Sequence, residues 1–161
     1  MKRLTLAALL ALTPFAVQAA QPSALGVYGA WTAASLGSGT ARICYAFTHA
    51  RGSSMAIDAR GAAMLAVTER HGAPDEVSIS PGYRYPARAK IALTVRRTQV
   101  GFYHSGKNAC TTQNLAAIAA FRAGNTADVT APSPDHGRPV TDHYALTGFS
   151  AAYGAIKRAC P

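Results

Sequence analysis

Short runs that alternate apolar and polar residues, each ended by a turn rich in Gly, Pro or Ser, fill most of the chain after residue 20. In one run Ile91, Leu93 and Val95 are apolar, and Ala92 and Thr94 lie between them. Because successive side chains of a strand point to opposite faces, this alternation is typical of a strand with one buried face. The expected strands are 27–34, 41–50, 61–71, 76–80, a hairpin within 89–106, 127–131 and 141–148.

A first helix is expected at about 111–123. Thr111 or Thr112 is a suitable N-cap, and Gly124 is suited to the left-handed conformation that ends many helices. The expected apolar face consists of Leu115, Ile118 and Ala119, with Phe121 beside them.

A second helix is expected at about 149–159. Its apolar residues recur at helical spacing and form one stripe, made of Phe149, Ala152, Tyr153, Ile156 and Cys160. Lys157 and Arg158 near its end suit the helix dipole. Together these patterns predict a mainly β fold, either a β-sandwich or a curled antiparallel sheet, with two short helices covering it.

The first 20 residues have the three parts of a secretory signal peptide. Lys2 and Arg3 are followed by an uncharged apolar run, and small residues end the segment at Ala19 and Ala20. The run is shorter than the roughly 20 apolar residues of a membrane-spanning helix. We therefore expect residues 1–20 to be cleaved, and residues 21–161 to form a single exported domain without a transmembrane segment.

The chain is basic, with 16 Lys and Arg against 7 Asp and Glu and a formal net charge of +9. Loss of Lys2 and Arg3 with the signal peptide lowers that charge by two. In an exported protein such a charge favours anionic lipid, lipopolysaccharide or an envelope protein as partner, and nucleic acid is not expected. Export permits disulfides, and three cysteines, Cys44, Cys110 and Cys160, allow one bridge and leave one thiol over.

No motif of a known catalytic or metal site is present. The sequence has no G-x-S-x-G, no H-E-x-x-H and no phosphate-binding loop, and its five histidines are scattered. Asp75 and Glu76 are adjacent, so in a strand they face opposite sides and do not form an acid–base pair. Asp142 and His143 beside a serine are a weak candidate for a triad. We therefore assign no catalytic, cofactor-binding or metal-binding residue and expect no cofactor.

The most distinctive stretch interleaves aromatic and basic residues. A candidate binding face for an anionic or sugar partner consists of Tyr83, Arg84, Tyr85, Arg88, Lys90, Arg96 and Arg97. The alternative interpretation is a Pro81–Gly82 turn whose tyrosines pack at the rim of the core. If 90–95 is one strand of a hairpin, Lys90 and the pair at 96–97 lie roughly 20 Å apart, so a polymer or membrane surface spans both and a small ligand does not.

Several segments together resemble one family. The chain has VYGAW at 27–31, CYAF at 44–47, LAVTER at 65–70 and VSISPGYRYP at 77–86, and it ends on TDHYALTGFSAAYGAIKRAC at 141–160. This pattern resembles the invasion-associated locus B family of exported Gram-negative proteins over nearly all of the chain after residue 20. The resemblance implies a β-rich protein of the periplasm or outer membrane, or a secreted one, with a role related to invasion or host interaction. It supplies no catalytic residue or cofactor.

The resemblance includes Cys44 and Cys160, each in a strongly patterned element, and we predict that these two form the disulfide. Cys110 then remains as the odd thiol.

The function expected on these grounds is a non-enzymatic envelope protein that binds an anionic surface or a protein partner. One alternative is a periplasmic glycan or cell-wall hydrolase, which paired carboxylates in a cleft would favour. Another is an envelope assembly factor or chaperone, which an open strand edge would favour.

Overall fold

The computed structural model describes residues 21–134 and 138–161, so the predicted signal peptide lies outside the described residues. The helices are α1 (Asn114–Ala123) and α2 (Phe149–Ala159), with a short 3-10 turn at Gly39–Ala41. The strands are β1 (Ser23–Tyr28), β2 (Trp31–Leu36), β3 (Ile43–His49), β4 (Gly52–Ser53), β5 (Met64–Arg70), β6 (Glu76–Ser80), β7 (Ile91–Val95), β8 (Thr98–Ser105), β9 (Asn108–Cys110), β10 (Thr126–Pro132) and β11 (Pro139–Ala145).

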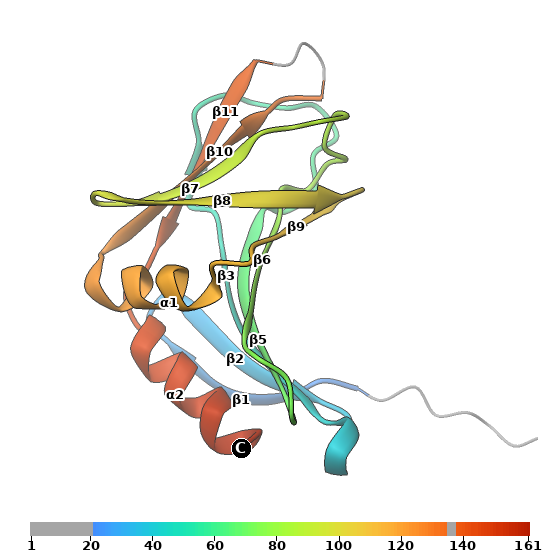
Figure 1. Cartoon of the computed structure of the whole chain (residues 1–161), viewed down its shortest axis with the longest axis vertical. Coiled ribbons are helices and arrows are strands. Elements are labelled where there is room, and N and C mark those ends of the chain that lie inside the picture. Colours follow the sequence, from blue (N-terminus) through green and yellow to red (C-terminus); the bar gives the residue numbers. More distant parts are fainter. Residues whose placement is uncertain (1–20, 135–137) are drawn as a thin grey trace, which may run out of the picture.

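In the described part of the chain these strands form one antiparallel sheet in the order β1-β2-β3-β5-β6-β9-β8-β7-β10-β11-β4. The sheet curls strongly, and the helices lie on its inner side (Figure 1). The curl brings β2 against β11, eight places away in the sheet, where the indole N–H of Trp31 donates to the carbonyl of Ala145 at 3.0 Å. Of the two expected architectures, the curled antiparallel sheet with two helices is the one present.

Three aromatic rings from β2, α1 and α2 meet at the centre of the core. The ring centroid of Phe149 lies 4.9 Å from that of Trp31 and 5.2 Å from that of Phe121, both edge-on. All three side chains are buried. Edge-to-face contact is a favourable arrangement of aromatic pairs, so this cluster joins both helices to the sheet.

The second helix is confirmed with the expected stripe, and all five of its predicted apolar residues are buried. Gly148 precedes the helix at φ 91°, and a Cβ there would lie 1.8 Å from the carbonyl oxygen of Tyr28. Only glycine tolerates both the backbone angle and this close approach. The turn at Gly148 therefore determines where α2 begins against β1.

The first helix forms, but its ends and its buried face differ from the prediction. It begins at Asn114 because the Thr111 hydroxyl donates to the carbonyl of Gly101 and accepts from the N–H of Gln113, which keeps 111–113 out of the helix. Gly124 is extended, at φ −107°, and its lack of a side chain serves close packing instead, since a Cβ would lie 2.3 Å from Val95.

The buried residues of α1 are Ala117, Ile118, Ala120 and Phe121. Leu115 and Ala119, which were expected on the inner face, are exposed instead.

Residues 27–34 are not one strand. The chain turns at Gly29 and Ala30 between β1 and β2, and the N–H of Ala30 donates to the carbonyl of Thr147. Gly29 has φ 59°, which suits a tight turn. The short strands β4 and β9 were not expected either, because two or three residues are too few to show alternation.

The disulfide between Cys44 and Cys160 is confirmed, with the Cα atoms 6.0 Å apart. It joins the middle of β3 to the residue after α2 across a sequence separation of 116. Cys110 on β9 is the free cysteine and is partly exposed.

Candidate functional site

The five basic residues of the candidate face are all exposed. Strands β7 and β8 form the expected hairpin, with Ile91 opposite Phe102 and Val95 opposite Thr98. Arg96 and Arg97 make the turn at one end of it, and Lys90 directly precedes β7 at the other end. Six residues of extended chain separate these ends by about 20 Å, so the structure does not gather the five groups at one point.

Two of these arginines have a backbone conformation that favours glycine. Arg88 has φ 59° and Arg96 has φ 55°. For a residue with a Cβ the left-handed region costs about 1–2 kcal/mol. Both residues are exposed and sit in turns, where glycine would avoid this cost.

The two tyrosines belong to the core, which corrects their assignment to the candidate face. Tyr83 is 8% exposed and Tyr85 is 4% exposed. The Tyr83 hydroxyl donates to the carbonyl of Pro132, and the Tyr85 ring packs 5.4 Å from that of His104. Burial raises the pKa of Tyr85 well above its usual value. The alternative interpretation of this stretch therefore holds for both tyrosines, and the candidate face narrows to Arg84, Arg88, Lys90, Arg96 and Arg97.

Beside these tyrosines, Arg60 and Asp142 form a largely buried ion pair that the sequence did not indicate. The Arg60 guanidinium donates to both carboxylate oxygens of Asp142 and to Ser53, and its Nε donates to the carbonyl of Pro81 at 2.6 Å. It also lies over the ring of Tyr83, 5.3 Å from the centroid. These contacts occupy the guanidinium, so the pair fastens the loop before β5 to β11 rather than presenting a free cation.

The Asp142–His143 combination does not form a triad. Because β11 is a strand, the two side chains point to opposite faces: Asp142 is buried, whereas His143 is exposed. The ring Nδ1 of His143 lies 2.8 Å from Asp128 Oδ1.

Two carboxylates converge elsewhere, beside α2: Glu69 is buried and Asp75 is half-buried. Lys157 Nζ donates to Glu69 Oε2 at 2.5 Å and to Asp75 Oδ1 at 3.3 Å, and the Tyr153 hydroxyl donates to Asp75. Burial, together with the neighbouring carboxylate of Asp75, raises the pKa of Glu69. Burial acts in the same sense on Asp75, but the hydrogen bonds from its neighbours outweigh it and lower its pKa.

The sequence points to the adjacent residues Asp75 and Glu76, whose side chains diverge. The carboxylate that lies near Asp75 in the fold is instead Glu69, on strand β5. A usable signal is the alternation of β5, in which Glu69 occupies the inward register of Leu65 and Val67. An acidic residue in such a position predicts a buried partner.

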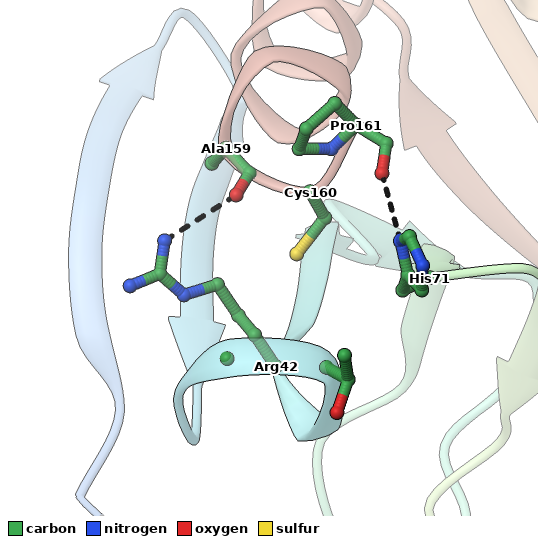
Figure 2. A pocket seen from close by; sticks show the side chains of 7 residues that line it. Arg42, His71, Ala159, Cys160 and Pro161 are labelled. Carbon is green, nitrogen blue, oxygen red and sulfur yellow. Dashed lines mark hydrogen bonds between the residues drawn. The ribbon is translucent and has the colours of Figure 1, made fainter.

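A hollow of about 420 Å³ lies at the end of α2, beside Cys160 of the disulfide. Arg42 and His71 flank it, and both side chains point toward the end of the chain (Figure 2). Arg42 donates to the carbonyl of Ala159 at 3.4 Å, and His71 Nδ1 lies 3.2 Å from the carbonyl oxygen of Pro161. Both polar side chains therefore bind the protein's own backbone, which makes this hollow a weaker ligand site than its size suggests.

Within residues 21–134 and 138–161, no group of His, Cys, Asp and Glu side chains has an arrangement that suits a metal ion. In the same residues no helix is long and apolar enough to cross a membrane.

Comparison with known proteins gives one family. The family model described as "Invasion associated locus B (IalB) protein" matches residues 31–157, from the first residue of β2 into the last turn of α2. No curated protein and no solved structure gives a significant match.

Proposed function

The chain belongs to the invasion-associated locus B family, and from that premise we propose that it is a non-enzymatic envelope protein that binds an anionic surface. The observation that carries this proposal is the uncompensated charge of residues 84–97. Arg84, Arg88, Lys90, Arg96 and Arg97 are exposed, and among the described residues none of them pairs with a carboxylate. We propose the periplasm, the outer membrane or the secreted state as the place of action.

The spacing of the charges favours an extended partner. One group of basic residues precedes β7 and the other forms the β7–β8 turn, about 20 Å away. A membrane surface or a polyanion such as lipopolysaccharide reaches both groups at once. Attraction of this kind acts within about 10 Å at 0.1 M salt, so it weakens steeply as salt rises.

The hydrolase alternative would need carboxylates that are free to act on a substrate. Glu69 and Asp75 are the converging pair, but Lys157 bonds to both carboxylates and Tyr153 bonds to Asp75. Neither carboxylate lines the hollow beside Cys160, the hollow at the β7–β8 turn or the hollow beside Arg60. This arrangement supports a role in holding α2 to the sheet.

The chaperone alternative would need an accessible strand edge. β1 is at the end of the sheet, but its register shifts between Ala24 and Gly26. A bulge of this kind twists an edge away from further pairing, and this supports surface binding over strand addition.

The test is binding to anionic vesicles and to lipopolysaccharide across a salt series. The face variant changes Arg84, Arg88, Arg96 and Arg97 to Ser. The control variant has the same net charge and changes four exposed residues outside the face to Ser, namely Arg42, Arg51, Arg138 and Arg158. At about 1 kcal/mol for each basic residue near an anionic surface, the four substitutions of the face variant should weaken binding by close to a thousandfold at low salt. Equal loss in the two variants, or binding that is indifferent to salt, would contradict the proposal.

A further inference from the structure

Helix α1 is apolar on the side that faces solvent as well as on the side that faces the core. Between Asn114 and Ala123, only Asn114 and Arg122 are polar. Leu115 is 79% exposed, and Ala119 and Ala123 follow it at helical spacing and are exposed too. A surface helix normally presents polar residues on this side, so the outward face of α1 has the composition of a contact surface.

Three guanidinium groups surround the C-terminal end of this helix. Arg96 of the β7–β8 turn donates to the carbonyl of Ala123 at 3.2 Å, and Arg122 lies 4.9 Å from the centroid of the Tyr153 ring. Arg97 is exposed, with no carboxylate partner among the described residues.

A hollow of about 710 Å³ lies between the β7–β8 turn and the end of α1, with Arg96, Arg97 and Ala123 among its lining residues. Figure 1 shows the same neighbourhood, with the β7–β8 turn above the end of α1. Because Ala123 belongs both to the hollow and to the outward face of α1, the cationic and apolar parts form one continuous surface. We call it the α1 surface, made of Leu115, Ala119, Ala123, Arg122, Arg96 and Arg97.

We propose that the α1 surface docks on the anionic phospholipid of a membrane, with Leu115 entering the boundary between headgroups and acyl chains, Arg97 binding lipid phosphate, and Arg96 and Arg122 adding positive charge beside it. This inference rests on the proposed function and adds to it the part of the molecule that touches the membrane. The expected partner is phospholipid because the apolar and the cationic side chains of the α1 surface lie side by side. A soluble polyanion would meet the arginines but would gain nothing from Leu115.

The dimensions of the helix suit this arrangement. Leu115 and Arg122 lie seven residues apart and on the same side, which is about 10 Å along the axis. Apolar side chains of interfacial helices enter the headgroup and acyl boundary by about 5–10 Å, while arginine side chains extend back to the phosphates.

The first test places a fluorescent indole at two matched positions. Leu115→Trp reports on the α1 surface, and Val27→Trp on β1 is the control, because Val27 is 74% exposed and lies outside that surface. The native Trp31 is fully buried and provides a constant background. The vesicles contain equal parts of phosphatidylglycerol and phosphatidylcholine, the latter brominated on its acyl chains. We expect a blue shift and quenching for the indole at position 115 and neither for that at position 27.

The second test measures affinity for the same vesicles. Loss of an inserted leucine side chain should weaken binding about tenfold in Leu115→Ser. Loss of one guanidinium should weaken it about fivefold in Arg97→Ser. Val27→Ser and Arg51→Ser are the matched controls, since both residues are exposed and lie outside the α1 surface and the candidate face, and both should bind within about twofold of the parent.

The outcomes separate this inference from the proposed function. Salt-dependent binding to vesicles without quenching at position 115 would overturn the α1 surface and leave anionic-surface binding intact. Binding to lipopolysaccharide or polyphosphate but not to the vesicles would do the same. Absence of binding to any anionic surface at low salt would overturn both.

Discussion

Removal of the Cys44–Cys160 bridge should destabilise the protein strongly. Both cysteines are buried, so the double variant Cys44→Ala, Cys160→Ala removes the covalent link with little change in volume. The bridge closes a loop with a sequence separation of 116. In the chain-entropy description, a loop of that length restricts the unfolded chain by about 5 kcal/mol. This equals the whole stability of a marginal domain.

Urea unfolding of the oxidised parent, the reduced parent and the double variant measures this loss. If the bridge acts on the unfolded chain, reduction and substitution should lower the unfolding free energy by the same amount. Both should also steepen its dependence on urea, because the unfolded chain without the bridge is less compact and exposes more surface. Cys110→Ser is the control and should change little, since it leaves the bridge in place. A loss below about 1 kcal/mol, or a parent and double variant with the same urea dependence, would refute the entropic argument.

Two further predictions concern the contacts of α2. Phe149→Ala should cost about 3–5 kcal/mol in a thermal or urea melt, because its buried ring contacts Trp31. The pKa of Asp75, which lies beside Glu69, is lowered. Its ionised form therefore stabilises the fold at pH values above the ordinary pKa of an aspartate. Asp75→Asn should accordingly be less stable than the parent at neutral pH, and this deficit should shrink as pH falls below about 4. Glu69 has a raised pKa, so its contribution to stability falls as pH rises, and any deficit of Glu69→Gln relative to the parent should shrink above about pH 4.5. Parallel pH profiles for the two acidic variants would contradict these assignments.

The strands and α2 could be predicted because each has one face toward the core and one toward solvent. In β7 the alternation of Ile91, Leu93 and Val95 with smaller residues reports burial directly. In α2 polar residues such as Lys157 and Arg158 mark the outward side. Helix α1 has only two polar residues, Asn114 and Arg122, one near each end, and several faces fit its apolar spacing equally well. For this reason the sequence predicts Leu115 on the inner face of α1, although it is exposed.

The candidate site was predictable only where charge decides exposure. Ionised arginine and lysine heads stay in water, so the positions of Arg84, Arg88, Lys90, Arg96 and Arg97 follow from residue type. A tyrosine has an apolar ring and a polar tip and suits either environment. Tyr83 is covered by Arg60 and bonded to Pro132, and Tyr85 packs on His104; all three partners lie well away from the tyrosines in the sequence. The Arg60–Asp142 and Glu69–Asp75–Lys157 contacts are equally non-local, and only the curl of the sheet brings them together.

Arg96 offers a way to separate binding from stability. Its charged side chain serves binding in the proposal, whereas its backbone conformation favours glycine. At φ 55° a residue with a Cβ carries a penalty of about 1–2 kcal/mol that glycine avoids. Arg96→Gly and Arg96→Ser both lose the hydrogen bond to Ala123 and the charge, so they should bind anionic vesicles equally weakly. The glycine variant should nevertheless be the more stable of the two by about 1 kcal/mol in a urea melt. Arg97 is not at positive φ, and there the order should reverse, with glycine about 0.5–1 kcal/mol less stable than serine. If glycine gave no advantage over serine at position 96, the penalty assigned to a Cβ at φ 55° would be wrong.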